Sequence, residues 1–326
     1  MKILLDTLGA DKGYEVVVKG GLKALENHPN LEITFIGVEE DIKKLTNDFK
    51  EYKRISIIDT AEFISNDEEP ALAIRRRKNS SMHLGFKKLN EAGYDGFISC
   101  GSTGALLAGA TLITKRLDKI SRGALTVVMP SKTGNVLLVD AGANMDCTPE
   151  LLCQFAIMGD VYSREVLGYT NPKVGLLSVG TEDNKGDSLR KETFQLLKDL
   201  NVNFIGNIEG RDALSGNIDV IVSDGFAGNV LLKSIEGTAI LLTDILKDNI
   251  HKSFRNKLGA LLMKPALYSL KASLDYNEVG AAPLLGVKKA VFKAHGSSNS
   301  RAIEKGIDQL IQFIEKDVIE KIENNL

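Results

Sequence analysis

The sequence predicts an α/β protein with a doubly wound, largely parallel sheet between layers of helices. Along its 326 residues, short apolar runs rich in β-branched residues alternate with segments of helical periodicity, which is typical of that fold class. Most runs are apolar along their whole length, as expected for strands that helices cover on both faces. No low-complexity linker interrupts the pattern, so we expect a single domain over residues 1–326.

The individual elements follow from these runs in chain order. Apolar runs predict strands at Lys2–Asp6, Glu32–Ile36, Arg54–Ile58, Gly96–Ser99, Leu125–Met129, Val136–Asp140, Val174–Val179, Val202–Ile205, Val220–Ser223 and Ala290–Lys293. Helical spacing predicts helices at Tyr14–Leu25, Ala105–Arg116, Glu150–Leu167, Leu189–Leu200 and Val230–Lys247. Only Ser131–Gly134 separates two neighbouring strands, which predicts a hairpin and a mixed sheet. The amphipathic run Asn299–Ile322 is expected to pack one apolar stripe on the body.

The composition excludes several classes of function. Lys and Arg number 41 against 43 Asp and Glu, so the basic excess of a dedicated nucleic-acid binder is absent and we expect no nucleic-acid partner. The three cysteines, Cys100, Cys147 and Cys153, form no C-x-x-C pair, which predicts reduced thiols and a cytoplasmic protein. No zinc-ligand spacing and no nucleotide fingerprint occur, so we expect no zinc site and no nucleotide cofactor.

Small polar residues and glycines gather after the predicted strands, where open α/β sheets bind their ligands. Six such turns are expected to share one edge of the sheet. The best phosphate candidate is Gly101–Gly104, because a strand leads in, glycines permit close approach, and a helix with free N–H groups follows. For any single turn, the alternative is that glycine only permits the turn and the polar residue only caps a helix.

Three single residues suggest chemistry, each with a structural alternative. Lys185, in a polar loop, is suited to offset the charge of an oxyanion or phosphate, or is simply a solvated lysine. His295 follows an apolar strand and fits a general acid or base, or a hydrogen-bonded structural role. Covalent catalysis by Cys100 is disfavoured, since no histidine is obviously paired with it.

Two basic regions suggest partners. The first comprises Arg75, Arg76, Arg77 and Lys78, which predicts a dock for an acidic partner or an ordinary exposed face. The second lies in a helical hairpin that we expect over about residues 238–275, with its tip near residues 258–263. Its apolar stripe flanked by Lys and Arg indicates a helix lying on an anionic membrane surface, a dimer interface, or both.

Several strings of this sequence together resemble one family, the bacterial phosphate acyltransferases (PlsX). They are Ser99–Ala108, Asp140–Cys147, Gln154–Gly159, Asn203–Asp212, Asp224–Val230, Ala282–Gly286 and His295–Ser298. The resemblance runs from Met1 to the C-terminal helix in the order of the family. The chain departs from the family pattern at Lys12, where a histidine is usual, at Ser102, where asparagine is more usual, and at Ala281, which replaces a glycine.

The resemblance implies a function and an architecture. The function is reversible transfer of a fatty acyl group from acyl carrier protein to inorganic phosphate, giving acyl phosphate for phospholipid (phosphatidic acid) synthesis, with a glycerol-3-phosphate acyltransferase downstream. The architecture is a three-layer α/β/α sandwich, related to phosphotransacetylases and isocitrate dehydrogenases, with a protruding helical hairpin. It also implies a homodimer that attaches peripherally to the inner face of the cell membrane.

Roles for the site residues follow as hypotheses. The turn Ser102–Gly104 and Lys185 would hold phosphate, Asn229 with backbone N–H groups near Gly228 would polarise the thioester, and His295 or Asp224 would protonate the thiolate or orient the groups. Further expected substrate contacts are Asp6, Gly101, Thr103, Asn144 and Ser297, the carrier protein would dock on Arg75–Lys78, and the membrane would meet Phe254, Leu258, Leu261 and Leu262. The alternatives are an acyltransferase that uses acyl-CoA and a catalytically silent membrane scaffold.

Overall fold

The computed structural model describes residues 1–49, 52–267 and 280–326, and it confirms the predicted mostly parallel, mixed α/β sheet. Across these residues one sheet has the strand order β3-β2-β1-β4-β11-β10-β5-β6-β9-β7-β8. The strands are β1 (Lys2–Asp6), β2 (Glu32–Gly37), β3 (Ile55–Asp59), β4 (Gly96–Ser99), β5 (Ala124–Ser131), β6 (Gly134–Val139), β7 (Lys173–Leu177), β8 (Asn203–Ile208), β9 (Val220–Val222), β10 (Ala281–Leu285) and β11 (Ala290–Ala294).

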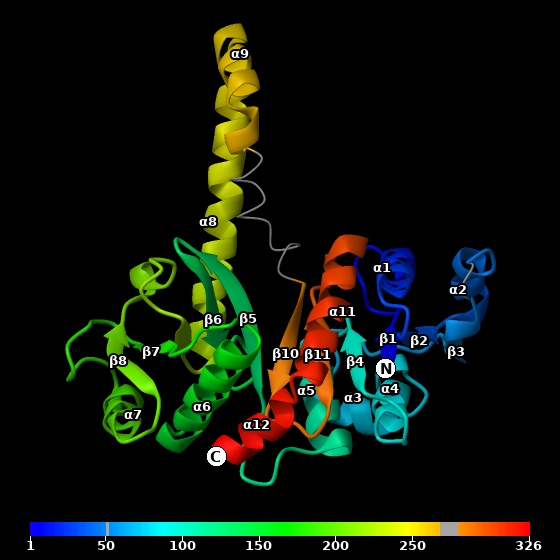
Figure 1. Cartoon of the computed structure of the whole chain (residues 1–326), viewed down its shortest axis with the longest axis horizontal. Helices are drawn as coiled ribbons and strands as arrows, with labels where there is room; N and C mark the ends of the chain where they lie inside the picture. The colour runs from blue at the N-terminus through cyan, green and yellow to red at the C-terminus, as the bar shows by residue number, and fades with distance from the viewer. Residues whose placement is uncertain (50–51, 268–279) are drawn as a thin grey trace.

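Helices cover both faces of this sheet, which makes the predicted three-layer sandwich (Figure 1). They are α1 (Tyr14–Asn27), α2 (Glu39–Thr46), α3 (Pro70–Arg76), α4 (Ser81–Leu89), α5 (Thr103–Gly109), α6 (Pro149–Glu165), α7 (Ser188–Lys198), α8 (Gly225–His251), α9 (Phe254–Leu262), α11 (Ser300–Glu315) and α12 (Val318–Asn325). Short 3₁₀ turns at Tyr52–Arg54 and Gly210–Asp212 and a π-helical segment at Ala110–Thr114 complete the set.

Alternate residues of the strands supply the two halves of the core. Leu4 and Phe97 pack in the cluster beneath α3, α4 and α5. Their neighbours Leu5 and Ile98 belong to the cluster on the other face, beneath α1 and α11. Strands buried on both faces cannot alternate apolar with polar residues, which explains the continuous apolar runs of the sequence.

The sheet consists of two parallel blocks that run in opposite directions. Strands β1, β2, β3, β4 and β11 are parallel to one another, and so are β6, β7, β8 and β9. Three successive antiparallel pairings, β11–β10, β10–β5 and β5–β6, join the blocks. The expectation that six polar turns share one edge is therefore wrong, because the carboxyl ends of the second block point the other way.

Two local expectations need correction. Strand β10 was not predicted as a strand, since two alanines and Pro283 have weak strand propensity. The predicted helix 105–116 is the short α5 followed by the π-helical segment. The C-terminal run 299–322 packs an apolar stripe on the body as expected, and it consists of two helices separated at Asp317, whose φ of 50° is left-handed. The predicted hairpin Ser131–Gly134 between β5 and β6 is confirmed.

Helix α8 projects far out of the body, and α9 lies at its distal end (Figure 1). The break between them falls at Lys252 and Ser253, where the Ser253 hydroxyl caps α9 by accepting from the Asn256 N–H. The Asn256 side chain donates to the Asn249 carbonyl at 2.6 Å, which fastens α9 to α8. The residues expected at the tip, 258–263, instead lie within and just after α9, and the end of the expected range, from 268, lies outside the described residues.

Candidate active site

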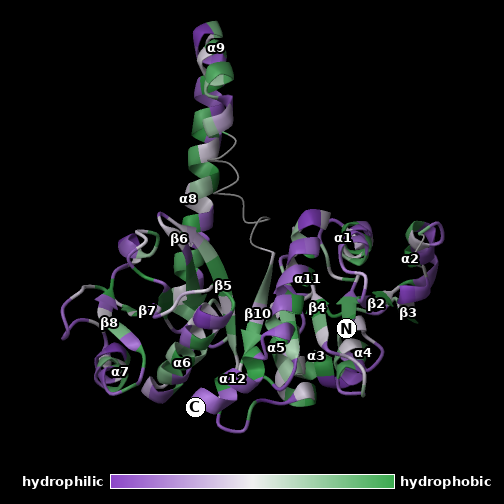
Figure 2. Cartoon of the chain, in the orientation of Figure 1, coloured by the Kyte–Doolittle hydropathy of each residue, from purple (hydrophilic) through white to green (hydrophobic). Residues whose placement is uncertain are grey.

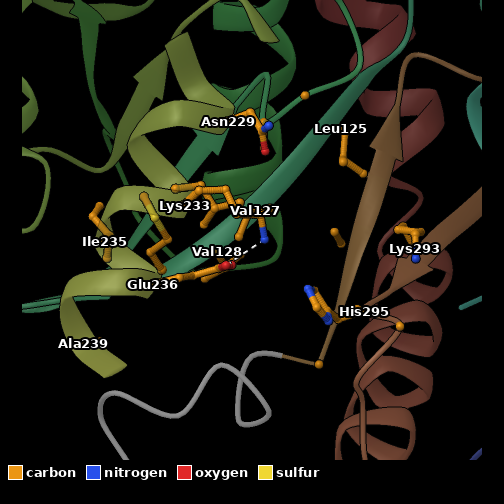
Figure 3. A pocket seen from close by; sticks show the side chains of 18 of the residues that line it. Leu125, Val127, Val128, Asn229, Lys233, Ile235, Glu236, Ala239, Lys293 and His295 are labelled. Atoms are coloured by element: carbon orange, nitrogen blue, oxygen red, sulfur yellow. Dashed lines mark hydrogen bonds and ion pairs between the residues drawn. The ribbon is translucent and has the colours of Figure 1, made fainter. Parts of the chain in front are cut away.

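A cavity of about 960 Å³ lies between the first block of strands and the wall formed by β5 and α8. Lys293 and His295 lie on one side of it, and Asn229, Val127 and Val128 lie on the other (Figure 3). The turn after β4 also contributes to its wall through Cys100, Gly101 and Thr103. Ligand cavities commonly form at such a junction, where the topology of an open sheet changes.

The turn after β4 is held by hydrogen bonds from the row of strand ends beneath it. In that row Asp6 of β1 lies beside Ser99 of β4, and the Ser99 hydroxyl donates to Asp6 Oδ2 at 2.7 Å. The same hydroxyl accepts from the Gly101 N–H at 3.0 Å. Gly9 approaches so closely that a Cβ there would lie 2.8 Å from the Gly101 Cα, so only glycine fits.

Two residues that were predicted to contact substrate, Asp6 and Ser102, instead stabilise this turn. Asp6 is fully buried, and burial raises its pKa to about 6, while hydrogen bonds from Ser99, Ser81 and Leu8 oppose that rise. Ser102 is buried and caps α5, its hydroxyl accepting from the Ala105 N–H at 3.5 Å. Neither Asp6 nor Ser102 lines the cavity, whereas Gly101 and Thr103 do. The turn thus presents backbone, and one threonine, to a ligand.

Asn229 reaches the cavity from the first turn of α8. Asp224 caps that helix by accepting from the Ala227 N–H at 2.9 Å, and its other oxygen is paired with Arg190. Gly228 packs against the loop after β6, where a Cβ would lie 1.9 Å from the Asp140 carbonyl oxygen. Asp224 and Gly228 therefore fix the position of Asn229 and do not themselves line the cavity.

The loop after β6 is organised around one buried carboxylate. Asp140 accepts from the N–H groups of Leu125, Gly142, Ala143 and Asn144, and from the Asn144 side chain at 2.8 Å. Burial raises the pKa of Asp140, and the bonds from Ala143 and Asn144 oppose this. Asn144 was expected to contact substrate. It is buried, and its side-chain amide donates to Asp140 and to the Gly123 carbonyl. It is placed to shape the loop.

His295 is exposed at the cavity wall, next to Ser297. The Ser297 N–H donates to His295 Nδ1 at 3.1 Å, which places the proton of the neutral ring on Nε2. Burial lowers the pKa of His295, the charge of Lys233 lowers it further, and Glu236 opposes both. A neutral imidazole with a fixed tautomer is suited to orient a group by hydrogen bonding.

One end of the cavity is apolar. Its walls there are Val127, Val128 and Met129 of β5 and Leu232, Ile235 and Ala239 of α8. Lys233 and Glu236 form an ion pair at 2.7 Å on the same stretch of helix, visible as a dashed line in Figure 3. An apolar sector of this kind suits a hydrocarbon chain, and a polar end with glycine turns suits an anion.

The remaining predicted residues lie elsewhere. Lys185 is exposed in the loop after β7 and lies outside the cavity wall. Arg75, Arg76 and Lys78 are exposed on or just after α3, which packs on α5 beside the phosphate candidate. Arg77 is held by Glu68 at 2.5 Å and Glu62 at 3.4 Å.

Cys100 lines the cavity but is buried, and burial raises its pKa to about 12. A thiol with so high a pKa is a poor nucleophile near neutral pH, which argues against covalent catalysis. In the part of the chain that the structure describes, no group of three or more His, Cys, Asp or Glu side chains is arranged to hold a metal ion. Nor is any helix among the described residues long and apolar enough to cross a membrane.

Sequence reasoning missed Lys293 and the apolar wall. Lys293 lies in β11 at the level of Ser99, partly buried in the cavity wall. A charged residue in an otherwise apolar central strand was the available signal. The apolar wall was hidden because its residues belong to a strand and a helix that already had a structural explanation.

Comparison with known proteins assigns the chain to a family. The family model described as "fatty acid synthesis protein" matches residues 1–321. A phosphate acyltransferase from Finegoldia magna is 50% identical over 326 residues, covering 100% of this chain and 99% of that protein. One from Bacillus cereus is 46% identical over 324 residues, covering 99% and 97%.

Solved structures are similar in fold at much lower identity. A phosphotransacetylase from Streptococcus pyogenes superposes with a TM-score of 0.61 at 19% identity, covering 98% of this chain and 94% of that one. A branched-chain phosphotransacylase from Enterococcus faecalis gives a TM-score of 0.60 at 14% identity, covering 96% and 99%. These similarities confirm the expected relation to the phosphotransacetylase fold.

Proposed function

From the premise that the chain belongs to the bacterial phosphate acyltransferase family, we propose that it transfers a fatty acyl group from acyl carrier protein to inorganic phosphate. The product would be an acyl phosphate. Because an acyl phosphate is an activated acyl donor, its consumer must be another acyltransferase. We place the reaction before acylation of glycerol 3-phosphate, in phosphatidic acid synthesis.

The cavity is the observation that carries this proposal. A single space joins a glycine turn at a helix N-terminus to an apolar sector between β5 and α8. Phosphate is suited to the first and an alkyl chain to the second. A phosphotransferase acting on small polar substrates would have no use for six apolar side chains, Val127, Val128, Met129, Leu232, Ile235 and Ala239, along the wall.

The chemistry requires positioning more than acid–base catalysis. Hydrogenphosphate is itself a nucleophile, and its oxygen attacks the thioester carbon while the C–S bond breaks. The proton that hydrogenphosphate gives up balances the one that the departing thiolate takes. We assign phosphate binding to the Gly101 turn and Thr103, polarisation of the carbonyl to Asn229, and orientation to the Nε2–H of His295. The buried ion pair with Arg190 removes Asp224 from the acid–base roles.

The exposed cations supply long-range attraction. Arg75, Arg76 and Lys78 lie beside the cavity, on the helix that packs against α5, and we propose that the acidic carrier protein docks there. Lys185 makes no ion pair within the described residues. We propose that it raises the local concentration of phosphate from outside the cavity wall. Its removal should then slow turnover less than removal of Asn229.

Exposed apolar residues on the projecting helices are proposed to meet a second copy and a membrane. Figure 2 shows apolar residues along α8 and α9 beyond the body. On α8 they include Ile240, Leu241, Leu242 and Ile245, and on α9 they are Phe254, Leu258, Leu261 and Leu262. Exposed apolar patches of this extent are typical of interaction surfaces. We assign the α8 residues to a homodimer and α9, with Arg255 and Lys257, to an anionic bilayer surface.

The proposal is tested by comparing acyl donors. Wild-type protein is incubated with phosphate and either a long-chain acyl carrier protein or the matching acyl-CoA, and the kcat/KM of thiol release is measured. We expect a higher kcat/KM with the carrier protein and dependence on phosphate for both donors. Thiol release that does not require phosphate would show a thioesterase instead. A higher kcat/KM with acyl-CoA would show that acyl-CoA is the donor, with the reaction type unchanged.

The site assignment is tested in the same assay with Asn229→Ala. Loss of one donor to a developing oxyanion costs roughly a hundredfold or more in kcat, and we expect that loss here. Lys185→Ala is measured in parallel, with a smaller fall that high ionic strength abolishes. A folded Asn229→Ala variant with near-normal kcat would remove Asn229 from the mechanism.

A further inference from the structure

One charged side chain of the cavity wall has no role in the proposed mechanism. Lys293 is partly buried near the end of β11 and contributes to the cavity wall. Its ammonium donates to the Cys100 carbonyl at 3.0 Å and to the Ala294 carbonyl at 2.5 Å. An ammonium group has three N–H donors. Removing such a charged group from water costs free energy unless its donors are paired.

The hydrogen bonds of Lys293 fix one particular peptide group. The Cys100 carbonyl belongs to the Cys100–Gly101 peptide, whose N–H donates to the Ser99 hydroxyl on the opposite side. Lys293 and Ser99 therefore clamp this peptide from both ends. Since the peptide begins the glycine turn, its orientation sets the direction of the N–H groups that follow at Thr103 and Gly104.

The titratable groups that act on Lys293 are all acidic. Burial lowers the pKa of Lys293, and Cys100, Asp11 and Asp6 oppose that change. Asp6 is itself buried with a raised pKa of about 6, and Asp11 lies at the cavity wall. A bound anion would be attracted to the ammonium, and this attraction is stronger in a partly buried site than in open water.

We propose that Lys293 is the positioning residue of the phosphate subsite, which holds the Cys100–Gly101 peptide in place and supplies the resident positive charge beneath the bound phosphate. This inference rests on the proposed function, because it takes phosphate as the ligand of the glycine turn. It adds that phosphate affinity depends on a lysine of the neighbouring strand β11, and that affinity for the acyl donor does not depend on it.

The test is a pair of variants that separate charge from hydrogen bonding. Lys293→Met keeps an unbranched side chain and removes both, whereas Lys293→Gln keeps one donor for the Cys100 carbonyl and removes the charge. Lys288→Met is the matched control, since Lys288 follows β10 near the other end of β11 and is exposed, paired with Asp118. Each protein is assayed for the KM of phosphate and, separately, of the acyl donor.

We expect both Lys293 variants to raise the KM for phosphate roughly tenfold or more, as loss of a charged hydrogen bond does. The KM for the acyl donor should stay within about twofold, and Lys288→Met should match wild type. An unchanged phosphate KM, or equal rises in both KM values, would overturn the inference, because a merely structural lysine would affect both substrates alike.

Phosphate binding without the acyl donor separates this inference from the proposed function. Thermal unfolding is followed with increasing inorganic phosphate, against sodium chloride at matched ionic strength. Stabilisation of wild type that both Lys293 variants lack supports the inference, even if acyl transfer is not found and the proposed function fails. Equal stabilisation of wild type and variants, or none in wild type, overturns it.

Discussion

Asp6→Asn is predicted to remove a loss of stability that wild type suffers as pH rises. Most carboxylates have the opposite effect, because their pKa is lowered on folding. Burial raises the pKa of Asp6 from 3.8 to about 6. A raised folded-state pKa contributes stability that is fully present below pH 3.8 and is lost as pH rises through about 6. At about 1.4 kcal/mol for each pH unit, the loss is about 3 kcal/mol. Asparagine cannot ionise, and its amide oxygen can still accept from Ser99.

The measurement is urea unfolding of wild type and Asp6→Asn between pH 4.5 and 7.5, in buffers free of phosphate. The difference in unfolding free energy, variant minus wild type, should rise by about 2 kcal/mol over that range. The same substitution at Asp59, an exposed carboxylate at the end of the neighbouring β3, is the control. A difference that stays constant or falls as pH rises would show that burial does not raise the pKa of Asp6.

Three further predictions concern the cavity and its approaches. Ala239→Phe fills the apolar sector, so product analysis with mixed acyl donors should show preference shifted to shorter chains by roughly tenfold; an unchanged chain profile would place the acyl chain elsewhere. Gly228→Ala brings a Cβ against the Asp140 carbonyl and should lower the unfolding free energy by about 3 kcal/mol, measured by urea unfolding. An unchanged unfolding free energy would show that the loop after β6 moves to accept the extra carbon. Arg75→Glu combined with Lys78→Glu should raise the KM for the acyl carrier protein roughly tenfold at low salt and leave that for acyl-CoA unchanged; equal effects on both donors would exclude docking there.

The fold was predictable from the sequence because its strands are buried on both faces. The predicted ranges for β1 and β4 coincide with the observed strands. Strand direction was not predictable in the same way. The blocks reverse through β10, whose Ala-Ala-Pro sequence gives no strand signal, so the turns were placed on one edge when they lie on two.

The sequence predicted the site only where backbone N–H groups of a glycine turn form it. Gly101 and Thr103 were found because a glycine turn between strand and helix is visible in sequence. Lys185 and Asp224 lie outside the cavity wall, although Asn229 of the same block of strands lines it, and Asn144 braces a buried carboxylate. Lys293 needed the structure, because the sequence does not show which carbonyls its ammonium bonds.

The most direct measurement of the central claim uses radiolabelled inorganic phosphate and long-chain acyl carrier protein. Label should appear in a lipid-soluble product that hydroxylamine cleaves, in amounts equal to the free carrier thiol released, and Asn229→Ala should abolish both. Released thiol with free fatty acid and no labelled product would mean that water, and not phosphate, accepts the acyl group at this cavity.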